Sequence, residues 1–224
     1  MISSTGNMKR KKIMDLLLFN PFHYFAGIKA MITGIIIILL TGYLAFLSGC
    51  RFDGLISIHF TGYWPPLLNC LLDGVISWLI MSLLLIIAGK FISRSRFRII
   101  DVIGTQALAR FPFFIFSLIS LLPGINIASA RYQRRLSSLD SFTDLISADL
   151  IPFIIIFGAI ILMTVWMITL MYNAFSVSCN VSGKKALFGF GICFLIGAIF
   201  SPLAIQYIPS ESKKQVQVEI NNLA

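Results

Sequence analysis

Charged side chains are scarce in this sequence. They make up 12% of the 224 residues, whereas a soluble domain usually carries about 25%. Hydrophobic residues make up 58%, which is more apolar surface than a soluble fold of this length can bury. The excess must face lipid, so the composition places the chain among membrane proteins. The apolar runs are continuous rather than alternating, which argues against an outer-membrane barrel.

Residues that bind metals or perform catalysis are also few. The sequence has two histidines and four cysteines, and no two cysteines have the CxxC spacing. A structural zinc site is therefore not expected. We find no nucleophile motif, phosphate-binding loop or carboxylate pair of the kinds that enzymes use. The sequence thus predicts a protein that is not an enzyme and needs no cofactor.

Positive charge is in excess, with 18 lysines and arginines against 9 acidic residues and a net charge of +9. These basic residues stand in short clusters beside apolar runs, and no basic face with interleaved aromatic residues lies outside the apolar segments. We therefore interpret them as topology signals and as contacts to anionic membrane lipids. Binding of nucleic acid is not expected.

Five apolar segments have about the 20 residues that a helix needs to cross a bilayer. They cover residues 28–48, 68–91, 102–122, 150–172 and 186–207. The fold class predicted is an all-α, polytopic membrane bundle of five transmembrane helices over residues 21–207, followed by a polar tail over residues 208–224. The third segment is the least lipid-like, so we expect it to be the most enclosed by its neighbours. In the fifth, Gly189, Cys193 and Gly197 form a stripe of small residues, which marks helix packing more often than dimerisation.

The first 20 residues form a basic segment of their own. A basic cluster at residues 9–12 is followed by an apolar stretch, which Asn20 and Pro21 interrupt. We interpret residues 9–19 as a short helix in the membrane interface, followed by Phe22, Tyr24 and Phe25 at headgroup level. The alternative is that this stretch is the start of the first span. A cleavable signal peptide is not expected, since no small-x-small cleavage site follows.

The distribution of lysine and arginine predicts the orientation. With the N-terminus inside, the inner segments hold eleven basic residues: Lys9, Arg10, Lys11, Lys12, Lys29, Lys90, Arg94, Arg96, Arg98, Lys184 and Lys185. The outer segments hold six: Arg51, Arg131, Arg134, Arg135, Lys213 and Lys214. The positive-inside rule therefore favours a cytoplasmic N-terminus and a C-terminus outside.

The candidate polar site within the membrane consists of Asp73, Gln106 and Arg110. A charge at the bilayer centre costs at least about 2.5 kcal/mol, so an arginine within the membrane is expected to have a structural or functional role. One interpretation is a polar site between helices, with Asp73 or Gln106 as the partner of Arg110. The other is an arginine that extends toward the interface and binds loop backbone or lipid phosphate. Asp73 is predicted near the opposite surface, so direct pairing needs a long rotamer or a tilted helix.

Pro112 makes the helix around Arg110 weaker. Proline lacks the N–H group that would bond the carbonyl of Leu108, and a freed carbonyl in lipid must find another donor. The Arg110 guanidinium offers several donors. We therefore expect the Arg110 side chain to point into the bundle or toward the inner interface, and not into lipid.

Two further expectations concern the loops. The basic residues Arg94, Arg96 and Arg98, together with the cluster at residues 9–12, are candidate contacts for anionic lipid, although the loop could simply determine topology. Cys50 and Cys70 flank the first outer loop, where they could form a disulfide or remain as two thiols.

Three stretches of this sequence resemble the prokaryotic branch of the Yip family, which are membrane proteins named for their interaction with Rab-type GTPases. These are Asn20-Pro21-Phe22, the segment from Asp101 to Pro112, and the residues from Trp166 to Leu170 together with those from Ser182 to Ala186. The resemblance covers roughly residues 15–207 and implies five spans with an inner N-terminus. Eukaryotic members usually carry a long cytosolic N-terminal region that is nearly missing here, so GTPase binding does not follow.

The sequence therefore favours a non-enzymatic Yip-type protein of a cell membrane, here a bacterial inner membrane, that organises lipids or partner proteins. The alternative is a small transporter or channel with its polar site around Arg110. A tightly packed bundle favours the first hypothesis, and a water-accessible cavity that reaches Arg110 favours the second.

Overall fold

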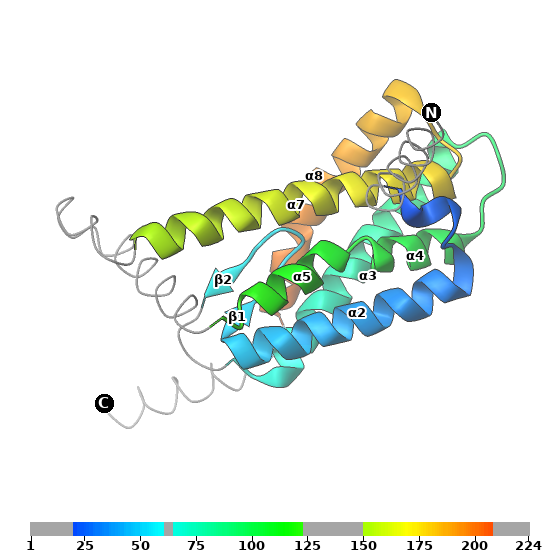
Figure 1. The fold of residues 1–224 in the computed structure, drawn as a ribbon. Helices are drawn as coiled ribbons and strands as arrows, with labels where there is room; N and C mark the ends of the chain where they lie inside the picture. The colour runs from blue at the N-terminus through cyan, green and yellow to red at the C-terminus, as the bar shows by residue number, and fades with distance from the viewer. Residues whose placement is uncertain (1–19, 61–64, 123–149, 208–224) are drawn as a thin grey trace, which may run out of the picture.

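The computed structural model describes residues 20–60, 65–122 and 150–207, and within them five helical spans are long and apolar enough to cross a membrane (Figure 1). These spans are Gly27–Ser48, Leu67–Ile92, Ile99–Ile119, Ile154–Ser178 and Gly183–Gln206. They match the five predicted segments to within a few residues at most ends. The all-α bundle is confirmed, and the protein has the architecture of a multi-pass membrane protein. The segments 1–19 and 208–224, with the predicted interfacial helix and the polar tail, lie outside the described residues.

A short 3-10 helix, η1 (Pro21–His23), comes before the first span. Tyr24 and Phe25, which follow it, are exposed as expected for headgroup-level aromatics. Phe22 differs, because its side chain is buried in the main hydrophobic core. The prediction that Phe22 lies in the interface is therefore wrong: η1 turns this ring inward, toward α7 (Leu150–Ser178).

Small residues determine which helices pack closely. Helix α2 (Gly27–Ser48) packs most extensively on α4 (Ile99–Leu108), and α3 (Leu67–Ile92) packs most extensively on α8 (Gly183–Gln206). A Cβ atom added to Gly104 would lie 2.7 Å from the carbonyl oxygen of Gly27, so only glycine allows α2 and α4 this close. Helix contacts of this kind are typical of membrane bundles, where packing replaces the hydrophobic effect between helices.

The predicted stripe of small residues on the last span faces α3. Gly189 lies against Ile92, Cys193 donates a weak hydrogen bond from Sγ to the Leu84 carbonyl at 3.5 Å, and Gly197 lies against Met81. The stripe therefore serves packing within the bundle, as expected.

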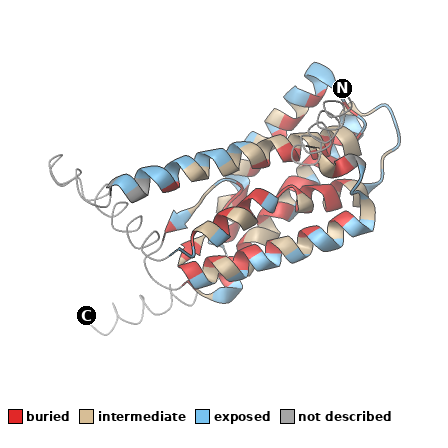
Figure 2. Cartoon of the chain, in the orientation of Figure 1, coloured by how far each residue is buried: buried red, intermediate tan, exposed pale blue. Residues whose placement is uncertain are grey.

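The third span is divided into two helices, α4 and α5 (Phe111–Ile119). Ala109 and Arg110 lie at the break, where the sequence predicts a weakened helix. This span is the most buried of the five, which confirms that it is enclosed by its neighbours (Figure 2). The more exposed spans carry apolar side chains toward the surroundings, as lipid-facing helices do.

A hairpin that folds back into the bundle connects α2 and α3. Its strands β1 (Cys50–Arg51) and β2 (His59–Phe60) pair antiparallel. Its buried apolar side chains include Phe52, Leu55 and Phe60. The Phe52 ring contacts two rings of α5, with centroids 5.2 Å from that of Phe113 and 6.2 Å from that of Phe116. Irregular backbone within a membrane bundle is stable where protein surrounds it. The sequence predicts this segment as an outer loop, and its burial in the bundle was not expected.

Candidate functional site: a polar centre and a basic end

Arg110 occupies the break between α4 and α5. Its backbone (φ −82°, ψ 2°) caps α5, and Pro112 lies in the first turn of that helix. Proline is favoured there because the first N–H groups of a helix have no intrahelical acceptor. The backbone N–H of Arg110 bonds the Ala107 carbonyl at 3.3 Å, a tighter turn than an α-helix makes. The local sequence thus ends one helix and begins another at the residue that carries the charge.

The Arg110 side chain points into the bundle. It is 4% exposed, and its Nη1 donates to the hydroxyl oxygen of Ser77 on α3 at 3.1 Å. The Ser77 hydroxyl in turn donates to the carbonyl oxygen of Asp73 at 2.7 Å. The prediction that this arginine does not face lipid is confirmed.

Asp73 and Gln106 have other partners, so the interpretation that pairs Arg110 with one of them is wrong. Asp73, which is fully buried, forms an ion pair with Arg51: Nε lies 2.6 Å from one carboxylate oxygen and Nη2 lies 3.2 Å from the other. The side-chain amide of Gln106 donates from Nε2 to the carbonyl of Met171 on α7 at 2.9 Å. The physical reason is the hairpin, because β1 brings Arg51 to the buried carboxylate from a segment expected outside the membrane.

Three polar atoms of the predicted site remain without a hydrogen-bond partner in the described part of the chain. They are Nε and Nη2 of Arg110 and Oε1 of Gln106, all buried. Native proteins leave few buried polar groups unpaired, because each costs free energy. We call Ser77, Gln106 and Arg110 the polar centre of the bundle.

Charge pairs also hold the hairpin itself. The hydrogen bond with Asp73 raises the pKa of Arg51, which therefore stays charged. At the start of β2, His59 Nδ1 lies 2.8 Å from a carboxylate oxygen of Asp53, two residues after β1. This hydrogen bond raises the pKa of His59. The pair closes the turn between β1 and β2 from the more exposed side.

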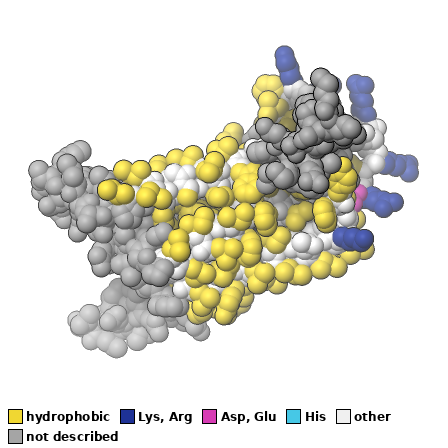
Figure 3. Space-filling model, viewed as in Figure 1, with side chains coloured by type: hydrophobic (Ala, Val, Ile, Leu, Met, Phe, Trp, Pro, Cys, Tyr) yellow, Lys and Arg dark blue, Asp and Glu magenta, His cyan; other side chains and the backbone are white. Residues whose placement is uncertain are grey.

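The opposite end of the bundle is basic (Figure 3). We define the basic end as the end where α2 and α4 begin, α3 ends and α8 begins. Its exposed basic residues are Lys29, Lys90, Arg94, Arg96, Arg98, Lys184 and Lys185. Figure 3 shows lysine and arginine side chains gathered at one end of the visible face, while the long side of the bundle carries hydrophobic side chains. This distribution suits a protein whose apolar length lies in lipid and whose basic end meets headgroups.

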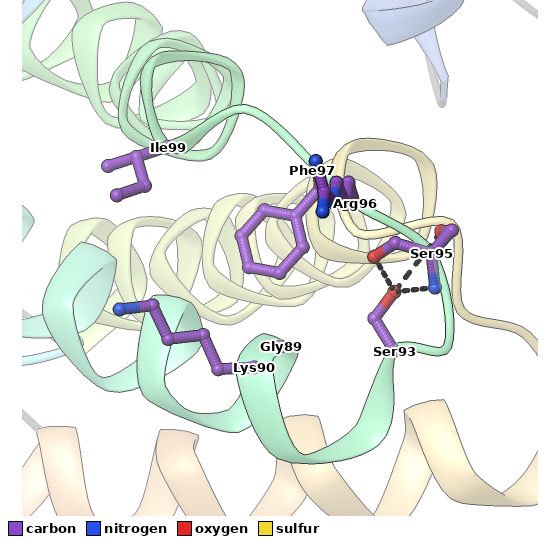
Figure 4. A pocket seen from close by; sticks show the side chains of 7 residues that line it. All are labelled: Gly89, Lys90, Ser93, Ser95, Arg96, Phe97 and Ile99. Carbon is purple, nitrogen blue, oxygen red and sulfur yellow. Dashed lines mark hydrogen bonds between the residues drawn. The ribbon is translucent and has the colours of Figure 1, made fainter.

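A pocket of about 340 Å³ opens at the basic end, between α3 and α4 (Figure 4). Its lining comprises Gly89, Lys90, Ser93, Ser95, Arg96, Phe97 and Ile99. Ser93 and Ser95 form a tight turn, in which the Ser93 hydroxyl donates to the Ser95 carbonyl at 3.0 Å and accepts from the Ser95 N–H at 3.2 Å. We call this the rim pocket.

Of the predicted lipid contacts, Arg96 lines the rim pocket. Arg94 and Arg98 are exposed beside it and are not among its lining residues. The cluster Lys9, Arg10, Lys11 and Lys12 lies outside the described residues. The serine pair could not be predicted from the sequence, because two serines in a basic loop indicate no site until the shape of the loop is known.

The cysteines are buried free thiols. Cys50 and Cys70 are thus unbonded, which is one of the two states that the sequence left open. Burial raises the pKa of the Cys179 thiol, next to the rim pocket at Gly89, to about 12. The thiol is therefore protonated at neutral pH and is a poor nucleophile.

No family model, curated protein or solved structure matches this chain. The function is therefore argued from the two sites described above and from the sequence motifs.

Proposed function

We propose that this protein is a non-enzymatic, Yip-type membrane protein that organises anionic lipids, and that the rim pocket is where it holds a lipid headgroup. The observation that carries the proposal is the combination of Lys90, Arg96 and the Ser93–Ser95 turn around one pocket at the end of two spans. The Yip assignment rests on the sequence motifs alone. The cytoplasmic orientation of the basic end rests on the positive-inside rule.

The chemistry of the pocket fits a phosphate group. Lys90 and Arg96 provide positive charge, and hydrogen bonds from charged donors to phosphate are shorter and stronger than neutral ones. The hydroxyl group of Ser95 adds a polar group at the same opening. A phosphodiester headgroup carries one negative charge, and the two basic side chains of the lining would attract it and donate to its oxygens.

The surroundings of the pocket fit the rest of a lipid. Ile99 lines the pocket and is 48% exposed, and Phe91, on the last turn of α3, is 86% exposed. These side chains offer an apolar path for acyl chains beside the charged opening. Helix α3 has 26 residues, which at about 1.5 Å each gives a length close to the full thickness of a bilayer with its headgroups. Its last turn, with Lys90, is therefore at headgroup level.

The test is native mass spectrometry of the purified protein in mild detergent, with phosphatidylglycerol or phosphatidylcholine added. We expect the parent protein to retain phosphatidylglycerol and to release phosphatidylcholine. The variant Lys90→Gln/Arg96→Gln should bind phosphatidylglycerol roughly tenfold more weakly or worse, because each charge-assisted hydrogen bond contributes about 1.5–3 kcal/mol.

The matched control is Lys184→Gln/Lys185→Gln, which removes the same charge from the same end but outside the pocket. Exposed charge pairs contribute about 0.2–1 kcal/mol, so this variant should stay within about fivefold of the parent. Equal losses in the two variants would mean that lipid is attracted by general surface charge, and the rim pocket would then not be a binding site.

A further inference from the structure

We propose that the polar centre binds a small monocarboxylate anion on the free edge of the Arg110 guanidinium. This site is separate from the rim pocket and goes beyond lipid organisation. It lies at the break between α4 and α5, in the most buried span of the bundle.

The chain itself shows what an arginine of this kind binds. Arg51 holds the carboxylate of Asp73 with Nε and Nη2, the two donors on one edge of its guanidinium. On Arg110 the corresponding two atoms, Nε and Nη2, are both buried and have no partner among the described residues. Ser77 takes Nη1 and leaves this edge unused. Two parallel N–H donors on a planar fork match the two oxygens of a carboxylate.

The charge of Arg110 needs a counter-ion that the described chain does not supply. Its acidic residues are Asp53, Asp73 and Asp101. Asp53 faces His59 and Asp73 faces Arg51. Asp101 lies in the first turn of α4, nine residues before Arg110, which is about 13 Å along a helix. An arginine within a membrane is otherwise found paired or beside backbone carbonyls.

The charge balance selects the anion. One carboxylate neutralises one guanidinium, whereas a phosphate dianion would leave a net negative charge in the low-dielectric interior. Gln106 stands one turn before Arg110, with its carbonyl Oε1 buried and without a partner among the described residues. A carboxylate that also carries a hydroxyl or amino donor could satisfy this atom.

The experiment is a thermal-shift titration of the full chain in detergent with sodium formate, acetate and lactate, at constant ionic strength set with sodium chloride. An anion that binds the folded state at about 100 times its Kd should raise the Tm by roughly 5–10 °C. Arg110→Gln should abolish the shift, and Arg110→Lys should reduce it because a point charge does not reproduce the fork. Arg98→Gln, which removes an exposed arginine at the basic end, should keep it.

A second measurement observes the arginine side chains of the parent protein directly. In the ¹⁵N-arginine spectrum of the parent protein, acetate should shift one Nε–H signal in a saturable way, and this signal should be absent from Arg110→Lys. A fatty acid that co-purifies with the parent in equal amount, and not with Arg110→Lys, would identify a lipid-borne carboxylate on the same edge and also support the proposal. The proposal is overturned if replacing chloride by the carboxylates leaves the Tm unchanged, if Arg98→Gln loses the shift as Arg110→Gln does, or if no Nε–H signal responds.

Discussion

The ion pair between Arg51 and Asp73 allows an asymmetric prediction. The Asp73 side chain is 0% exposed and that of Arg51 is 23% exposed. Removing Arg51 leaves a carboxylate buried without a counter-charge, and breaking a buried pair in this way costs about 3–5 kcal/mol. Removing the charge of Asp73 leaves an arginine on a hairpin that can turn toward water, so the cost should be nearer to about 1–2 kcal/mol.

The variants are Arg51→Met, which keeps the length of the apolar stem, and Asp73→Asn, which keeps the shape of the carboxylate. We expect Arg51→Met to lower the free energy of unfolding more than Asp73→Asn does. The double variant Arg51→Met/Asp73→Asn should be more stable than Arg51→Met alone, since no charge is then left buried. Stability is measured by unfolding in mixed micelles with increasing denaturing detergent.

A second assay reports on the hairpin directly. Cys50 is the first residue of β1 and is a fully buried free thiol. When the ion pair is broken, Cys50 should react faster with a maleimide, and the rate should increase more in Arg51→Met than in Asp73→Asn. If Asp73→Asn proves to be the more damaging change in both assays, the reasoning from unequal burial is wrong.

Three shorter predictions follow from other contacts. Gly104→Ala should lower the free energy of unfolding by about 1–3 kcal/mol, because the added methyl group would lie 2.7 Å from the Gly27 carbonyl oxygen. The control is Gly191→Ala, which should be neutral or slightly stabilising because nothing lies within 4 Å of the added methyl group. The pair of His59 with Asp53 should stabilise the hairpin fully below the unfolded pKa of histidine, about 6.5, and this stabilisation should disappear as the pH rises through the higher folded pKa. Because the histidine is 56% exposed, the effect should be no more than a few tenths of a kcal/mol, and it should be absent from the Tm-versus-pH curve of His59→Gln. Reporter tags fused to the two termini should lie on opposite sides of the membrane, since the described residues hold five spans, an odd number, and two tags on one side would contradict the five-span topology.

Features encoded locally could be predicted from the sequence. Each span is a continuous apolar run, so its position follows from hydropathy with no knowledge of its neighbours. The weakened helix at the break in the third span could also be predicted from nearby residues, because Pro112 acts on the turn directly before it. The burial of Arg110 followed from the cost of placing a charge in lipid.

Features that depend on tertiary contacts could not be predicted. The hairpin between β1 and β2 is short and has no long apolar run, and its burial arises from the rings of α5 that receive Phe52. The choice of partner for Asp73 depended on that burial, since Arg51 reaches the carboxylate only from a hairpin folded into the bundle. The rim pocket could not be predicted: the sequence names Arg96 by its charge as a candidate lipid contact, but Ser93 and Ser95 line the pocket only because of the shape of the loop.

The pairing of helices has a consequence for how the chain assembles. Helix α2 packs mainly on α4 and α3 packs mainly on α8, so the largest contacts are not between neighbours in the sequence. During synthesis, α3 enters the membrane more than ninety residues before Gly183 begins its main partner. Its packing face, with Met81 and the Leu84 carbonyl, must remain in lipid or on a temporary partner until α8 arrives. The bundle is therefore completed by its last span, and an incomplete chain would display an unfilled helix face within the membrane.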